Sequence, residues 1–334
     1  MSLLAILKDR NLPPLRSRKE MLDILQRECY GYRPTEGTYS VGEPSKPKRG
    51  FAMDEAQFDI VPFTVRTQRG EHTFPLRRLL HTDGKKRPFI IFMQFVEESH
   101  TLHFMPDLIA EQGFDILWFL YSEATRDNGD FENGVAPLFE RGCGKLAIWS
   151  RVASLVLDYA STLPMLDMEH ACVAGHSRLA KTALLTAALD ERFRYVYSNN
   201  AGCAGDALYR GMTGERIADI TDKFPYWFCD DFAKYAQQGY PTEWDQHWLL
   251  ACVAPRYVYV GASSKDAWAD PQSEQLCCLA AGQAWEQGLV HHDSFLEEGQ
   301  SLHDGCVGFH LRKGPHMLGY HDWMEFLAFV KKHF

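Results

Sequence analysis

One strand–turn–helix stretch constrains the fold more than any other part of the chain. Strand-forming residues at 169–174 run into a turn that contains Gly175 and Ser177, and a helix-forming run rich in Ala and Leu follows at 179–189. This order is the nucleophile-elbow pattern, in which a strained turn presents the serine and needs small neighbours. Leu179 occupies the place of the pattern's second glycine. A serine that only N-caps the helix is the simpler alternative, but the flanking strand and helix favour a nucleophile.

Strand-like and helix-like segments alternate along the rest of the chain. Strands are predicted at residues 58–66, 73–81, 88–94, 115–121, 193–198, 257–261 and 307–311. Helices are predicted at residues 17–30, 102–112, 144–163, 244–254, 272–288 and 321–333. The first two strands favour an antiparallel pair, whereas the continuously apolar run at 88–94 is typical of a buried central strand. The alternation predicts an α/β fold with a mostly parallel central sheet and helices on both faces.

The chain is interpreted as a single domain, residues 1–334, because no repeat or internal linker interrupts it. Residues 1–50 are predicted to form an N-terminal helix and a wrapping segment, in which 34–50 is a loop rich in Gly, Pro and Ser. Residues 202–243 are an irregular, aromatic-rich insertion near the active site, too long for a simple strand-to-helix connection.

Composition excludes several classes of function. The formal net charge of −9 argues against a nucleic-acid partner. No apolar run reaches transmembrane length and no secretion signal is recognised, so no membrane partner is expected. The nine cysteines are odd in number and scattered, which favours a reducing, cytoplasmic location. No CxxC or HxxxH cluster occurs, so neither a metal nor another cofactor is predicted.

A serine nucleophile needs a histidine base and an orienting carboxylate. In the chain order serine, acid, histidine, the histidine should follow the last strand, and His316 lies in that loop. The acid should follow the preceding strand, where Asp266 is the first choice. Asp270 is the reserve, because a position just before Pro271 is typical of a helix N-cap.

An ester hydrolase also needs hydrogen-bond donors for the oxyanion that forms during attack. The backbone N–H of Arg178 should be one, and a donor after the strand at 88–94, Phe95 or Val96, should be the other. The polar stretch 122–144, which contains Asp127, follows a strand; it is either a functional loop or a solvated crossover.

The stretch Gly175-His176-Ser177-Arg178-Leu179-Ala180-Lys181 resembles the Gly-Cys-Ser-Arg-x-Gly-Lys elbow of glucuronoyl esterases, carbohydrate esterase family 15. Similar blocks follow in family order at 200–205, 224–228, 245–250, 254–256 and 268–272, so the resemblance extends from Arg18 to the C-terminus. It implies an α/β-hydrolase fold and a serine esterase that needs no cofactor. The implied substrate is a small-molecule or oligosaccharide ester, since these enzymes cleave esters between 4-O-methyl-glucuronic acid and lignin alcohols.

The resemblance also assigns roles to single residues. Ser177 would be the nucleophile and His316 the base, while Arg178 would help to stabilise the oxyanion. The substrate-binding residues would be Lys181, which would bond sugar hydroxyls, Trp268, which would line the sugar site, and Glu215. Aromatic faces stack on sugar rings and a cation suits a uronate, which agrees with these roles. Without the resemblance, Lys181 would pass for a solvated helix lysine.

The sequence departs from the family pattern at three places. His176 replaces a cysteine and Ala180 a glycine, and the block 198–202, where fungal members carry the triad glutamate, has asparagine at that position. The acid must then come from elsewhere, which strengthens Asp266. A cytoplasmic member would act on small uronosyl esters or acetylated sugars. The alternatives are therefore an acetyl xylan esterase-type deacetylase and an inactive carbohydrate-binding homologue.

Overall fold

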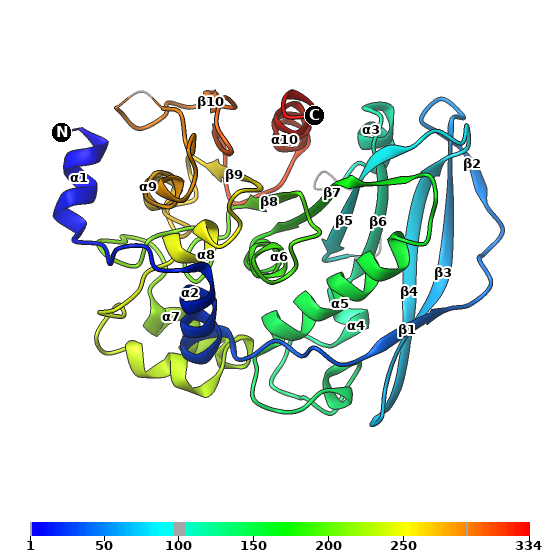
Figure 1. The fold of residues 1–334 in the computed structure, drawn as a ribbon, viewed down its shortest axis with the longest axis horizontal. Helices are drawn as coiled ribbons and strands as arrows, with labels where there is room; N and C mark the ends of the chain where they lie inside the picture. Colours follow the sequence, from blue (N-terminus) through cyan, green and yellow to red (C-terminus); the bar gives the residue numbers. More distant parts are fainter. Residues whose placement is uncertain (1, 97–103, 292) are drawn as a thin grey trace.

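A mixed β-sheet forms the centre of the molecule (Figure 1). The computed structural model describes residues 2–96, 104–291 and 293–334. Its strands are β1 (Thr38–Val41), β2 (Lys48–Phe51), β3 (Ala56–Thr67), β4 (Gly70–His81), β5 (Arg87–Gln94), β6 (Asp115–Leu120), β7 (Leu166–His176), β8 (Tyr195–Asn199), β9 (Tyr257–Ser263), β10 (Ser301–Leu302) and β11 (Val307–Arg312). Their order across the sheet is β1-β3-β4-β6-β5-β7-β8-β9-β11-β10, and β2 pairs with β3.

The middle of the sheet is parallel and its two ends are antiparallel. Strands β6, β5, β7, β8, β9 and β11 run parallel to one another. The pairs β3–β4, β4–β6, β1–β3, β2–β3 and β10–β11 are antiparallel. The predicted α/β class and the predicted antiparallel pair of strands are therefore confirmed.

Helices pack on both faces of the sheet. They are α1 (Leu3–Arg10), α2 (Arg18–Leu25), α3 (Pro106–Glu111), α4 (Tyr121–Ala124), α5 (Lys145–Ala160), α6 (Arg178–Leu189), α7 (Ile217–Lys223), α8 (His247–Ala251), α9 (Pro271–Ala281) and α10 (Tyr320–Lys332). Helices α3 and α10 share one hydrophobic core, and α5, α6, α8 and α9 share the other (Figure 1). In β5, Ile91 joins one core and its neighbours Ile90 and Phe92 join the other, because side chains alternate along a strand. A strand buried on both faces must be apolar along nearly its whole length, as residues 88–93 are.

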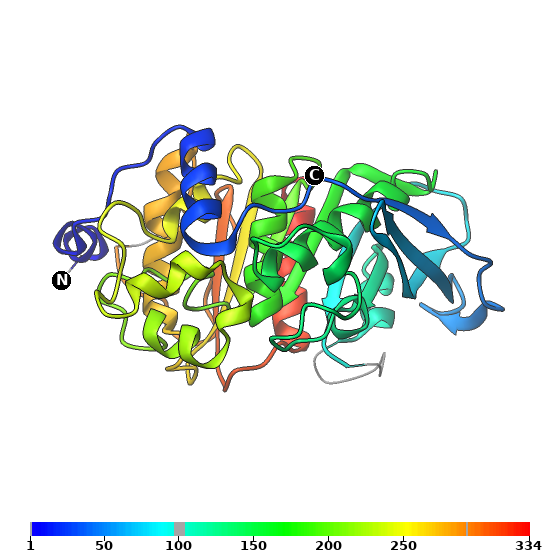
Figure 2. The same ribbon diagram turned by 90° about the horizontal axis from the view of Figure 1, so that it is seen from below.

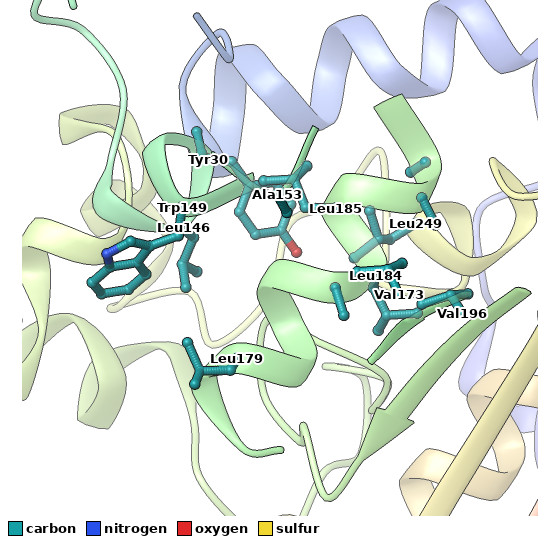
Figure 3. Packing of buried hydrophobic residues seen from close by; sticks show 14 of the residues in the cluster. Tyr30, Leu146, Trp149, Ala153, Val173, Leu179, Leu184, Leu185, Val196 and Leu249 are labelled. Atoms are coloured by element: carbon teal, nitrogen blue, oxygen red, sulfur yellow. The ribbon is translucent and has the colours of Figure 1, made fainter. Parts of the chain in front are cut away.

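Helix α6, which follows the elbow, is held on several sides. Figure 3 shows Leu184 and Leu185 of α6 among Ala153 of α5, Leu249 of α8 and Val173 of β7. All of these side chains are buried in one hydrophobic cluster. Helix α6 is therefore a rigid element, and it holds the turn that precedes it in place, as a preorganised site requires.

The N-terminal segment runs along the molecule from α1 at one end to β1 at the other (Figures 1 and 2). The predicted helix at 17–30 is present as α2, which continues as a π-helical turn, Gln26–Tyr30. The loop predicted at 34–50 is wrong in part, because it contains β1 and most of β2. These short strands lie at the sheet edge with mostly exposed side chains, so no apolar pattern marks them.

Other differences concern short elements and helix ends. Helix α1 and the two-residue strand β10 are additional, and the helices predicted at 244–254 and 272–288 are shorter, as α8 and α9. Of the helix predicted at 102–112, the first two residues lie outside the described part. The insertion at 202–243 holds α7 and two 3₁₀ turns, Pro225–Trp227 and Asp230–Tyr235. No helix in the described ranges has the length and apolar character needed to cross a membrane.

Candidate active site

Ser177 lies in a strained turn between β7 and α6. Its backbone angles are φ 56° and ψ −125°, and its N–H donates to the carbonyl of Asn199 at 2.9 Å. A Cβ atom on Gly175 would lie 2.1 Å from the carbonyl oxygen of Leu179, so only glycine fits there. The side chain of Leu179 is itself fully buried. The position that departs from the generic motif is thus filled by a packed side chain, and the elbow needs only its first glycine.

Asp266 and His316 meet beside this turn, each in the loop predicted for it. Asp266 follows β9 and is buried, and its Oδ2 lies 2.5 Å from Nδ1 of His316. His316 follows β11, and its side chain is 42% exposed. Its ring centroid lies 4.6 Å from that of His176, which precedes the serine. Because Nδ1 faces a carboxylate, Nε2 is the nitrogen left to exchange a proton with a reacting group.

Arg312 fixes the loop that carries His316. Its Nη2 donates to the carbonyls of Pro315 at 3.0 Å and Met317 at 2.6 Å, on either side of the histidine. Its Nε lies 2.7 Å from Oδ2 of Asp322, a fully buried carboxylate at the start of α10. Burial would raise the pKa of Asp322, but the hydrogen bond from His310 and the charges of His310 and Arg312 hold that pKa below its usual range.

Two asparagines occupy the block where fungal members of the resembled family have the triad glutamate. Oδ1 of Asn199 lies 2.7 Å from Nδ1 of His176 and accepts a hydrogen bond from Nδ2 of Asn200 at 2.9 Å. Nδ2 of Asn200 also donates to the carbonyl of Met317 at 3.3 Å. This block therefore contacts the His316 loop through amides and brings no carboxylate to it.

Asp270, the reserve candidate for the acid, is engaged as a helix cap. Its Oδ1 accepts from the N–H of Ser273 at 3.1 Å. Its Oδ2 accepts from the N–H of Thr213 at 2.6 Å and from its hydroxyl at 3.0 Å. The structure thus brings Asp266, and not Asp270, to His316.

Arg178 is the next residue in the sequence after the proposed nucleophile, and its side chain lies in an aromatic cage. The centre of its guanidinium lies 4.7 Å from the ring centroid of Trp227, 5.3 Å from that of Phe224 and 5.7 Å from that of Phe95. These distances are those of cation–π contacts. The guanidinium also donates to the carboxylate of Asp127, and the Arg178 side chain is 26% exposed.

Asp127 is the site residue that the sequence did not single out. Its Oδ1 accepts from Nε1 of Trp227 at 2.7 Å and its Oδ2 from the hydroxyl of Tyr121 at 3.0 Å. Its backbone carbonyl accepts from the hydroxyl of Tyr226 at 3.1 Å. Burial and the Asp127 charge raise the pKa of Tyr226 to about 12, so this phenol stays a donor at neutral pH. The only feature of the sequence that pointed to Asp127 was its place in the polar stretch 122–144, which follows a predicted strand.

The residues assigned to sugar binding have different surroundings. Lys181 is buried, and its ammonium donates to the carbonyls of Ala201 and Cys203. Trp268 is 49% exposed, with the ammonium of Lys223 lying 4.6 Å from its ring centroid. The N–H of Glu215 donates to the carbonyl of Trp268 at 2.8 Å, so these two residues are neighbours. The roles of Lys181, Trp268 and Glu215 in binding sugar stay predictions.

Two further carboxyl groups are buried behind the site, on Asp206 and on Glu274 of α9. Both accept from the N–H of Gly202, at 2.8 Å and 3.1 Å. Burial, followed by the neighbouring charge of Asp206, raises the pKa of Glu274 well above its usual range. Across residues 2–96, 104–291 and 293–334 no cluster of His, Cys, Asp and Glu has a metal-binding arrangement.

A strained serine turn above a mostly parallel sheet is the architecture of the α/β-hydrolase class, and this chain has it. A family model described as "Glucuronyl esterase, fungi" matches residues 70–288. The chain therefore belongs to the glucuronoyl esterase family, carbohydrate esterase family 15.

Curated relatives match part of their length. "Carbohydrate esterase MZ0003", from an unknown prokaryotic organism, is 36% identical over 192 residues, which are 57% of this chain and 44% of that protein. The 4-O-methyl-glucuronoyl methylesterase of Hypocrea jecorina is 29% identical over 171 residues, 48% of this chain and 37% of that protein. The chain thus spans less than half of the length of these two relatives.

Solved structures match over nearly the whole chain. A glucuronoyl esterase from Solibacter usitatus has 26% identity and a TM-score of 0.83, covering 95% of this chain and 92% of that one. A glucuronoyl esterase from Sporotrichum thermophile, solved in complex with methyl 4-O-methyl-β-D-glucopyranuronate, has 21% identity and a TM-score of 0.63, covering 80% and 70%. This second likeness shows the fold alone.

Proposed function

We propose that this chain hydrolyses carboxylic esters of carbohydrates, with Ser177 as nucleophile, His316 as base and Asp266 as the orienting acid. One observation carries the proposal: Oδ2 of Asp266 lies 2.5 Å from Nδ1 of His316, in the loops after β9 and β11. The chain order serine, acid, histidine is that of α/β-hydrolases. An inactive homologue would not need this pair beside an elbow serine.

The proposed reaction follows from these positions. Ser177 attacks the ester carbonyl as Nε2 of His316 takes the hydroxyl proton, and Asp266 stabilises the imidazolium. The protonated His316 then donates this proton to the leaving alcohol, which leaves an acyl-enzyme. Water, deprotonated by the same nitrogen, releases the acid and restores the serine.

The oxyanion would be stabilised by the backbone N–H of Arg178 at the start of α6 and by a second donor after β5. The N–H of Phe95 donates to Oε1 of Gln94 at 2.9 Å. This bond favours the N–H of Val96 as the second donor. The guanidinium of Arg178, held beside the turn, would add N–H donors, while its charge is balanced by Asp127.

The proposed substrate is a glucuronoyl ester such as methyl 4-O-methyl-glucuronate, as the names of the relatives suggest. One observation favours an acetyl ester instead, because the ammonium of Lys181 is buried and already bonded to two carbonyls. A cytoplasmic location, which cell fractionation would test, would restrict the substrate to small soluble esters.

The deciding experiment is hydrolysis of benzyl glucuronate and of acetylated xylo-oligosaccharide by the purified protein. Turnover of the glucuronate, lost in Lys181→Ala but not in Lys223→Ala, would support the glucuronoyl ester. Turnover of the acetylated sugar alone would support a serine esterase, but one whose substrate is an acetyl ester and not a glucuronoyl ester. Failure on both, without labelling by a fluorophosphonate, would overturn the proposed function.

Asp266→Asn is expected to lower kcat about 10³–10⁴-fold, because an amide cannot stabilise the imidazolium and favours the wrong tautomer. Asp270→Asn is the matched control and should change kcat little, because an asparagine still caps α9. Steady-state kinetics of both variants on one ester checks the assignment. A larger loss in Asp270→Asn would show that Asp270 is the acid.

A further inference from the structure

The charge of Arg178 is balanced by one carboxylate. Among the ion pairs of the described residues, Asp127 is the acidic partner of Arg178. The Asp127 side chain is only 12% exposed and that of Arg178 26% exposed. Water therefore screens the pair weakly, and each charge strongly influences the other. The contact joins the loop after α4 to the first residue of α6, 51 positions further along the chain.

Further contacts keep this pair in place. Trp227 donates to Oδ1 of Asp127 and also lies against the guanidinium of Arg178, so one ring contacts both charges. The hydroxyl of Tyr121 donates to Oδ2 of Asp127. Burial, followed by the Asp127 charge, raises the pKa of Tyr121 above its usual range, so this donor keeps its proton. The aromatic cage would hold the guanidinium even without the Asp127 charge.

We propose that Asp127 is a positioning residue that cancels the charge of Arg178, so that the site accepts an uncharged ester and releases an anionic acid. This proposal rests on the proposed function, in which the acid product forms at Ser177. Hydrolysis breaks the acyl C–O bond, transfers water oxygen to the acyl carbon and a proton to the alcohol. The acid then loses its own proton to solvent. The product thus carries a negative charge that the substrate lacks.

An unbalanced arginine beside the nucleophile would bind that product charge more tightly than it binds the ester. A guanidinium is a strong partner for carboxylates and remains protonated. With Asp127 present, the charges of the pair sum to zero and this preference is removed. Product inhibition is the property that Asp127 limits.

The test is calorimetric binding of glucuronate, the product, to the wild type, Asp127→Asn and Asp130→Asn. Asp130→Asn is the matched control, since it removes the same charge from an exposed position in the same loop. We expect the Kd of Asp127→Asn for glucuronate to fall about tenfold, and this gain to shrink in about 0.5 M sodium chloride. The control should keep the wild-type Kd.

An unchanged or higher Kd in Asp127→Asn, an equal fall in Asp130→Asn, or no binding by any of the three would overturn the proposal. If Asp127→Asn does not fold, Arg178→Gln decides, because the unbalanced Asp127 should then raise the Kd about tenfold. An unchanged Kd there would also overturn it. Turnover of benzyl glucuronate tests only the proposed function, so the two failures are distinguishable.

Product inhibition separates this role from a merely structural one. Loss of site geometry in Asp127→Asn would lower kcat and weaken glucuronate binding together. Loss of charge balance tightens glucuronate binding instead. Asp127→Glu, which restores the charge, is expected to return the Kd toward the wild-type value, and failure to do so while the variant remains folded would contradict the charge argument.

Discussion

Ser177→Ala is expected to lower ester hydrolysis by about 10⁵-fold or more and to leave the free energy of unfolding nearly unchanged. The loss follows because no other group replaces the hydroxyl as nucleophile in the proposed reaction. The stability is kept because alanine bears the same backbone strain at φ 56° as serine does. Hydrolysis of benzyl glucuronate and fluorophosphonate labelling measure the first effect, and urea unfolding measures the second.

Ser177→Gly separates the chemical role of the residue from its backbone strain. It should be as inactive as Ser177→Ala, yet more stable than the wild type by about 1 kcal/mol, because glycine adopts a positive φ without a steric penalty. Urea unfolding of the three proteins gives the comparison. Retained hydrolysis in either variant would exclude Ser177 as nucleophile, and a less stable Ser177→Gly would show that the turn is not strained.

Asp322→Ala is expected to lower the free energy of unfolding by about 3–5 kcal/mol, because it leaves the charge of Arg312 buried without its partner. It should also lower kcat, since Arg312 binds the carbonyls on both sides of His316. Asp304→Ala is the matched control. It removes a carboxylate from an exposed ion pair with Lys332 and should cost less than about 1 kcal/mol.

The stabilisation by Asp322 should depend on pH. The pKa of Asp322 is lowered in the folded protein, so the unfolded chain binds this proton first as the pH falls. The difference between the wild type and Asp322→Ala is complete above the ordinary carboxyl pKa near 3.8 and is lost as the pH falls through the lower pKa of the folded state. Urea unfolding at several pH values measures it. A difference that grows on acidification would contradict the ion pair.

The elbow could be predicted because its signal is local. A strand, a glycine, a serine and a helix follow one another within about twenty residues, and each segment's type follows from its own composition and periodicity. The positions of Asp266 and His316 followed from topology, since parallel strands present the loops after them at one edge of the sheet. The short edge strands β1 and β10 escaped prediction because exposed, short segments lack an apolar period.

What the sequence by itself determined is therefore the order of strands and helices, the strained serine and the loops from which a base and an acid would come. The tertiary structure decided which charges meet. In the folded protein His316 pairs with Asp266 rather than with Asp270. Arg178 pairs with Asp127, and Arg312 pairs with Asp322. These pairs join segments distant along the chain, and a charged side chain looks the same in the sequence whether it is solvated or paired. Its partner is selected by the packing of the sheet and its helices, which brings charges together where water is scarce and a partner is required.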